Sequence, residues 1–184
     1  MFTPRKTAAA LLCLALGATA SHAANPDVGG APMFTDKNII ENAVNSADHT
    51  TLVAAVKAAG LVDALMSEGP FTVFAPVNDA FAALPAGTVE TLLQPENKDQ
   101  LTKILTAHVV AGDISAQDIK AQAAGSSDGF VHLETLSGDA LSAQVRGNNV
   151  FVFDENGNAA KITIADVDQS NGVIHVVNKV LLPK

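Results

Sequence analysis

The spacing of apolar residues along this chain changes once, near Phe130. Before it, apolar residues recur every three to four positions, as in 37–47, which is typical of a helix with one buried face. From 131–134 onwards they alternate with polar residues, which is typical of half-buried strands. An early run at 71–75 is short, β-rich and bounded by prolines, and predicts a buried strand. The sequence therefore predicts an α+β fold, with several helices, mainly in the N-terminal half, packed against antiparallel strands.

Capping and turn residues set the expected limits of these elements. Asp48 is expected to cap a helix that ends at Gly60, and Asn78 or Asp79 to cap a later one. Asn171-Gly172 predicts a tight turn before the last strand. The expected helices are 37–47, 50–59, 61–66, 78–84 and 98–106, and the expected strands are 71–75, 108–110, 131–134, 141–145, 150–153, 161–167 and a final strand within 171–184.

The N-terminal residues have the pattern of an export signal. Arg5 and Lys6 precede an apolar run at 8–20 that is too short for a stable membrane span. Ser21 and Ala23 are the small residues that signal peptidase requires, so we expect cleavage after Ala23. The predicted organisation is a removed signal peptide at 1–23, a flexible tether at 24–36, rich in Gly, Pro and Ala, and one domain at 37–184.

The composition narrows the partner classes. The single cysteine, Cys13, lies in the apolar run after Leu12, which is too large for a lipoprotein processing site, so we expect no lipid or other membrane anchor on the mature chain. Cleavage would change the net charge from −8 to −10, which disfavours nucleic acid as a partner. Trp and Tyr are absent, so any aromatic contact must come from Phe. We expect a monomer.

No catalytic motif occurs in the sequence: there is no nucleotide-binding glycine loop, no G-x-S-x-G turn and no metal-spaced histidine pair. We therefore expect no cofactor, no metal and no catalytic residues. The remaining candidates are four histidines downstream of the cleavage site. A chemical hypothesis pairs two of them as acid and base or as metal ligands, oriented by an aspartate, while the structural hypothesis gives each histidine backbone hydrogen bonds. The histidines are His49, His108, His132 and His175, with His108 and His175 as the pair and Asp79 or Asp166 as the orienting group.

The tripeptide Arg146-Gly147-Asn148 invites comparison with an Arg-Gly-Asp adhesion sequence. Its third residue lacks the carboxylate that would coordinate an integrin metal. We give this comparison little weight.

Two segments carry a more specific pattern. The run Thr72–Phe81 reads T-V-F-A-P-V-N-D-A-F, a strand followed by helix-capping residues, and 171–184 reads N-G-V-I-H-V-V-N-K-V-L-L-P-K, a turn followed by a strand. In order and spacing they resemble the two signature boxes of fasciclin-type domains, and the likeness extends over about 38–183. The residues that carry the pattern, to which we assign structural roles, are Thr72, Phe74, Pro76, Asn78, Asp79, Phe81, Asn171, Gly172 and His175.

The resemblance implies a wedge of antiparallel strands flanked by helices, and a non-catalytic, exported adhesion or interaction module of bacterial type. The family's Tyr-His pair falls on Ala107-His108, and its Asp-Ile pair on Asp166-Val167. In animal members the Tyr-His region is implicated in integrin adhesion, and the Asp-Ile pair precedes the second box. The resemblance makes His108, Asp166 and Val167 the candidate binding residues, although the loss of the tyrosine puts an animal-type integrin site in doubt. The expected partner is a surface protein or a glycan, met at the cell surface or in the periplasm.

Two other functions stay open. One is a carrier of an apolar ligand such as a lipid or a carotenoid, since some fasciclin-type proteins hold carotenoid. The other, a minor alternative, is a hydrolase that uses His108 or His175, which would need a nucleophile or a metal within reach of the ring.

Overall fold

The computed structural model describes residues 25–184, so the predicted signal peptide and its cleavage site lie outside the described residues. Within the described part no helix is long and apolar enough to cross a membrane. The strands are β1 (Phe71–Pro76), β2 (Val109–Ala111), β3 (Phe130–Glu134), β4 (Ala140–Arg146), β5 (Asn149–Phe153), β6 (Ala159–Gln169) and β7 (Gly172–Val177). The helices are α1 (Ile39–Ala43), α2 (Thr50–Ala59), α3 (Val62–Leu65), α4 (Asn78–Ala82), α5 (Thr88–Leu92), α6 (Lys98–Thr106) and α7 (Ala116–Gly125), with short 3₁₀ turns at Ala47–His49 and Pro95–Asn97.

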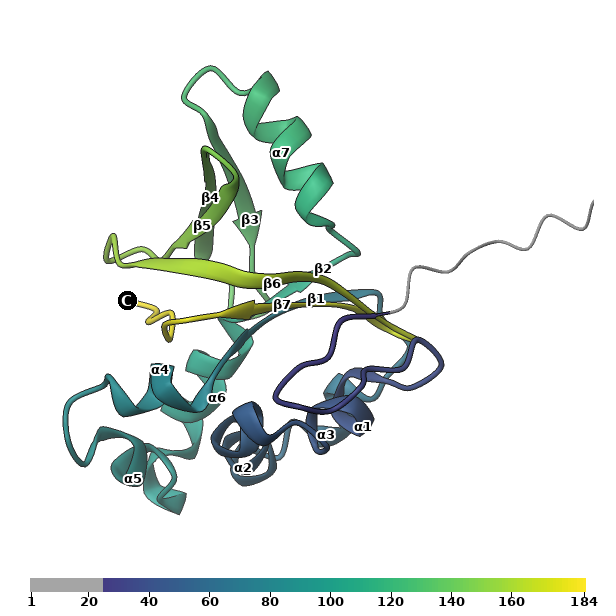
Figure 1. Ribbon diagram of the computed structural model, residues 1–184. Helices are drawn as coiled ribbons and strands as arrows, with labels where there is room; N and C mark the ends of the chain where they lie inside the picture. Colours follow the sequence, from purple (N-terminus) through teal and green to yellow (C-terminus); the bar gives the residue numbers. More distant parts are fainter. Residues whose placement is uncertain (1–24) are drawn as a thin grey trace, which may run out of the picture.

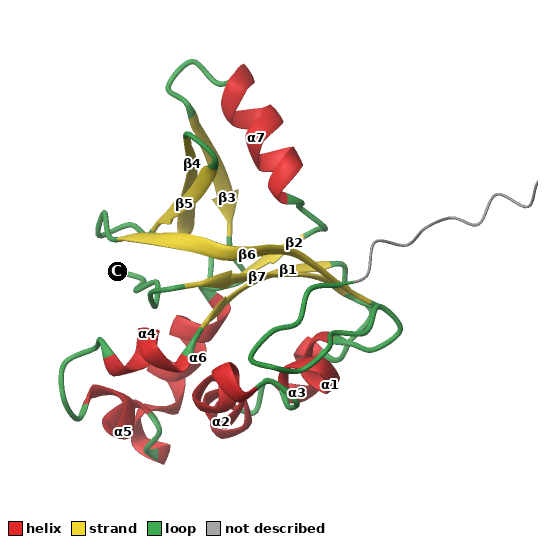
Figure 2. Ribbon diagram, viewed as in Figure 1, coloured by secondary structure: helices red, strands yellow, loops and turns green. Residues whose placement is uncertain are grey.

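The strands form one seven-stranded sheet in the order β2-β1-β7-β6-β5-β4-β3. Helices α1 to α6 lie on one side of the β1–β7 region, and α7 lies on the other side, beside β3 and β4 (Figures 1 and 2). The α+β architecture with most helices in the N-terminal half is confirmed. One pairing differs from the expected antiparallel arrangement, because β1 and β7 run parallel.

The parallel pair joins segments that are far apart in the sequence. Thr72 lies opposite Val173, and Phe74 lies opposite His175. The two motif segments are therefore neighbouring strands, the second and third of the sheet. A parallel pair needs a long crossover, and here the chain between β1 and β7 includes most of the domain.

Two apolar cores lie on opposite faces of this sheet. One fills the space between the sheet and α1 to α6 and includes Leu52, Leu101 and Ile174. The other lies inside the curve of the sheet under α7 and includes Phe74, Ile119 and Val152. The sheet curves so strongly that its two edges meet. Leu136 N, just after β3, donates to Val109 O of β2 at 2.8 Å. The helical and the strand halves of the sequence thus share one sheet with a core on each face.

The segment at 25–36 is not the flexible tether that we expected. Val28 and Met33 are buried at 3% and 6% exposure. Asn25 pairs with the backbone of Asp168, and Asn42 exchanges hydrogen bonds with both backbone groups of Phe34. Two apolar anchors and these polar contacts hold the segment across the helical core. We call residues 25–36 the N-terminal strap.

Asn78 has a different capping role from the one that we predicted. Its Oδ1 accepts from Thr51 N at 3.0 Å in the first turn of α2, and its Nδ2 donates to Ala47 O. The following helix, α4, has Val77 at its N-cap and no side-chain cap. Asn78 therefore fixes α2 against the end of β1, and Asp48, the expected cap of α2, is replaced by the 3₁₀ turn that ends at His49.

The final hairpin is set one residue earlier than expected. Its two loop residues are Ser170 and Asn171, and Gly172 already pairs with Gln169. The buried Asn171 amide accepts from Ile39 N and donates to Leu65 O and Ser67 O, so it connects α1 and α3 to the sheet. Gly172 lies so close to β1 that a Cβ would be 1.9 Å from Phe71 O, at a φ of +150°.

We expect Gly172→Ala to lower the free energy of unfolding by about 3 kcal/mol or more, because the methyl group would push β7 away from β1. Gly125→Ala is the matched control, since nothing lies within 4 Å of its new Cβ and its φ is not left-handed. Urea unfolding of both variants checks this expectation. Equal midpoints for Gly172→Ala and wild type would contradict the close approach.

Candidate functional site

His108 is a buried structural residue. Its Nδ1 lies 2.8 Å from Ile104 O in α6, and its Nε2 accepts from Leu181 N at 2.9 Å. These contacts place the proton on Nδ1. Burial lowers the pKa of His108 from 6.5 to about 4, so the ring stays neutral. The imidazole thus links the end of α6 to the chain after β7.

His175, on β7, is also a buried structural residue. Its Nδ1 accepts from Asp166 N at 3.2 Å and its Nε2 donates to Ile114 O at 2.8 Å. The side chain is fully buried, and its ring lies 5.6 Å from that of Phe74. Burial lowers the pKa of His175. Neither His108 nor His175 has a ring nitrogen free for proton transfer.

The three predicted binding residues do not form one exposed patch. His108 and Val167 are buried at 3% and 0% exposure, and Ala107 is buried at 1%. His108 lies beside β1, since its carbonyl accepts from Phe74 N, whereas Asp166 and Val167 belong to β6. Both β1 and β7 lie between them. Only Asp166 presents its side chain to solvent.

Asp166 has an unusual backbone. Its φ is +55°, in the left-handed region, and it lies where the register of β6 against β7 shifts between Ile164 and Val167. A bulge of this kind re-aims side chains out of a regular strand. Asp166 Oδ1 accepts from Ala116 N at the start of α7. Its carboxylate therefore stands out from the sheet in a fixed position.

Two further carboxylates lie in the segments next to His175. Asp113 precedes Ile114, whose carbonyl accepts from the His175 ring, and Asp168 follows Asp166 by two residues on β6. Asp113 and Asp168 are exposed. We call Asp113, Asp166 and Asp168 the acidic rim.

The other two histidines lie in different settings. His49 is buried, its Nδ1 lies 2.9 Å from Ser46 Oγ, and its Nε2 makes no hydrogen bond. The pKa of His49 is lowered by burial, partly opposed by the nearby Ala75 carbonyl. His132 is exposed and lies 3.5 Å from Asp128. Over residues 25–184, no three His, Cys, Asp or Glu side chains lie close enough together to hold a metal ion.

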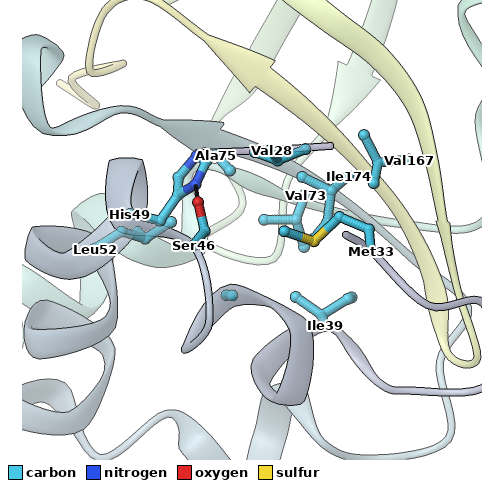
Figure 3. Close-up of a pocket in the computed structure, with 11 residues that line it drawn as sticks. Val28, Met33, Ile39, Ser46, His49, Leu52, Val73, Ala75, Val167 and Ile174 are labelled. Atoms are coloured by element: carbon cyan, nitrogen blue, oxygen red, sulfur yellow. Dashed lines mark hydrogen bonds between the residues drawn. The ribbon is translucent and has the colours of Figure 1, made fainter. Parts of the chain in front are cut away.

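His49 borders a small apolar cavity beneath the N-terminal strap. Figure 3 shows Val28 and Met33 of the strap on the same cavity as Val73 and Ile174 of the sheet. Its volume is about 20 Å³, close to the space of one water molecule. A second void of about 30 Å³ lies between α1, α2 and β1. Neither is large enough for a lipid while the strap is in place.

The motif residues serve mainly the fold. Thr72 Oγ1 accepts from Ile114 N and donates to Gly112 O, which fixes the turn after β2. Phe74 and Phe81 are core residues, and Asp79 is exposed at the start of α4. The motifs therefore identify the architecture rather than a reactive site.

Sequence reasoning missed two features. The strap anchors Val28 and Met33 are too sparse to form a periodic pattern, although each is a large apolar residue among Gly, Pro and Ala. Phe151 and Phe153 occupy the polar phase of their strand, since the neighbouring Val152 is the buried residue. A search for aromatic residues on the polar phase would have found them.

Comparison with known proteins agrees with this architecture. A family model described as the fasciclin domain matches residues 47–183. Protein sll1483 of Synechocystis is 55% identical over 145 residues, covering 79% of this chain and 73% of that protein. The immunogenic protein MPB70 of Mycobacterium bovis is 36% identical over 146 residues, covering 77% of this chain and 66% of that protein. The pig transforming growth factor-beta-induced protein ig-h3 is 39% identical over 132 residues, 72% of this chain but 17% of that protein.

A solved structure shows the same fold. It is a FAS1 domain pair from the insect cell adhesion molecule Fasciclin I, which superposes with a TM-score of 0.69 over 79% of this chain. The sequence identity is 19%, so the likeness concerns the fold, and the chain spans about half (51%) of that domain pair. By its sequence and its fold, the chain belongs to the fasciclin-domain family.

Proposed function

We propose that this chain is an exported, non-catalytic adhesion or interaction module that binds a protein or a glycan at the cell surface or in the periplasm. The family includes an insect cell adhesion molecule, which supports an interaction role. The predicted signal at 1–23 supports export.

The backbone conformation of Asp166 is the observation from which we infer where the partner binds. An exposed non-glycine residue in the left-handed region at a β-bulge is a conformation that the surrounding structure must hold in place, and such positions cluster at functional sites. Asp166 is held by Ala116 N and by His175 beneath it. We assign the partner contact to Asp166 and the rest of the acidic rim, with His108 and Val167 as buried supports of the fold.

The geometry of His108 and His175 argues against the hydrolase alternative. Both ring nitrogens of His108 and of His175 are engaged by the backbone. A general base needs a nitrogen within reach of the proton that it abstracts. The same contacts support a purely structural role for these rings.

An apolar-ligand carrier is a second candidate. The observation in its favour is a pair of apolar voids, one under the strap and one between α1, α2 and β1, which share Ile39 and Leu52 as lining residues. Movement of Val28 and Met33 would open the first void to solvent, and displacement of Ile39 and Leu52 would join it to the second and make room for a lipid or carotenoid chain.

Beads coated with the wild-type protein are expected to adhere to cells of the organism that expresses it, and Asp166→Asn is expected to reduce the number bound about tenfold. Asparagine keeps the acceptor for Ala116 N and tolerates the left-handed backbone, so only the charge is lost. Asp63→Asn, at an exposed site on α3, is the control. Unchanged adhesion of Asp166→Asn would remove the assignment of this surface, and adhesion of wild type no greater than that of albumin-coated beads would remove the function.

The buried histidines predict a loss of stability in mild acid. The folded pKa of His108 is about 4 and its ordinary value is 6.5, so below pH 6.5 the unfolded chain binds a proton that the folded chain excludes. The contribution of His108 is complete above pH 6.5 and falls as the pH approaches 4. We expect a loss of about 2 kcal/mol from this residue between pH 7.5 and pH 5.

Urea unfolding at both pH values, with wild type and His108→Gln, measures this loss. The variant should be less stable at pH 7.5 and should show a weaker dependence on pH. An identical pH dependence in the two proteins would mean that His108 titrates normally and is accessible.

The carrier hypothesis predicts that organic extracts of protein purified from its native host contain a bound lipid or pigment, enriched relative to the control protein. Mass spectrometry and visible absorption of the extract measure it, with an unrelated exported protein purified in parallel as the control. A colourless extract without enriched lipid would exclude the carrier role.

A further inference from the structure

Three phenylalanines lie on the solvent-facing side of the outer strands. Register places Phe130 opposite Gln144, and Gln144 opposite Phe151. Phe153 lies opposite Ser142 on the same face. The alternate residues, such as Val131 and Val152, point into the core under α7. These rings are half-buried, on a face where polar side chains are the rule.

Arg146 covers these rings. Its guanidinium carbon lies 5.6 Å from the centroid of Phe151 and 5.2 Å from that of Phe153. Phe130 and Phe153 meet edge to face, with centroids 5.8 Å apart. Arg146 Nε donates to Gln144 Oε1 at 2.7 Å, which fixes the plane of the guanidinium. We call Arg146, Phe130, Phe151 and Phe153 the arginine platform.

No helix covers the platform in the part of the chain that the structure describes. The one helix beside β3–β5 is α7, and its buried residues Ile119 and Ala123 belong to the core on the opposite face (Figure 2). The platform is therefore an unpartnered face of the sheet.

The charge of the platform is opposite to that of the whole chain. Arg146 is the sole arginine between 25 and 184, and it forms no ion pair with any described residue. Lys161 lies on the same face, opposite Phe151, and also has no ion pair among the described residues. Two carboxylates lie on the β3 side of this face: Asp128, 3.5 Å from the ring of His132, and the exposed Glu134. A chain with a net charge of −8 thus presents two cations together with unused hydrogen-bond donors.

We propose that the arginine platform binds an anionic polysaccharide, with the guanidinium of Arg146 and the ammonium of Lys161 on carboxylate or sulfate groups of the sugar chain. A guanidinium held flat by aromatic rings is pre-organised for a planar carboxylate. Its cost of ordering on binding is reduced, since Gln144 and the two rings already fix it.

A polysaccharide fits this face better than a folded protein does. Phe and Arg are also enriched at protein interfaces, but these rings are only half-buried and are bordered by polar side chains, without a broad apolar centre. Ser142, Gln144 and Asn149 border the rings and match sugar hydroxyl groups. The contact extends beyond the proposed function, because it assigns a second surface of opposite charge to the acidic rim.

Titration calorimetry with polygalacturonate at low salt tests the site. Wild type is expected to bind, and Arg146→Ala to weaken binding at least tenfold. Arg146→Lys should fall between them, since lysine keeps the charge but not the planar donor pair. Lys57 is an exposed cation on α2, outside the platform, and Lys57→Ala should bind like wild type. Dextran, which is neutral, should not bind.

Thermal unfolding of each variant shows whether the fold is kept, and Arg146→Lys remains a valid comparison if Arg146→Ala is unstable. Equal affinity of wild type and the Arg146 variants would overturn the proposal, as would the absence of binding by wild type. Polyglutamate bound as tightly as polygalacturonate, with the same dependence on Arg146, would overturn the assignment to a sugar and indicate an acidic peptide. The adhesion test of Asp166→Asn uses a different surface, so either proposal can fail alone.

Discussion

The parallel contact between β1 and β7 is the constraint on which the rest of the structure depends. It is possible only because Gly172 allows the two backbones to approach and because His175, buried between Phe74 and Ile114, has both ring nitrogens satisfied. The sheet extends from this pair in both directions, to β2 on one side and to β6 and the meander on the other. A core then forms on each face.

This constraint separates the residues that identify the family from those available to a partner. Most residues of the two motif segments belong to the β1–β7 pair or to its turn. The side chains of Thr72, Asn171 and His175 are hydrogen-bonded to backbone groups. The positions whose side chains are free of such contacts lie largely outside the motifs. The acidic rim, near the end of β6, and the arginine platform, on β3 to β5, lie outside the motifs and have opposite charges.

The sequence predicted those parts of the fold that depend on local pattern. The limits of α2 and α6 and the order of strands β3 to β6 followed from periodicity, and Gly60 ends α2 in a left-handed conformation as expected. Helix α7, rich in Ala and Gln, has little apolar periodicity and was not predicted. Contacts between distant segments were also beyond local pattern: the burial of His108 depends on Leu181, and that of Val28 and Met33 on the sheet. Two of the three candidate binding residues, His108 and Val167, are buried for this reason.

The position of β7 between β1 and β6 also affects the order in which the domain can fold. β7 is synthesised after the six other strands, yet it lies between β1 and β6. Until residues 172–177 are available, both of those strands have an open edge and neither core can close. A domain built in this way completes its fold only when its last strand has been synthesised.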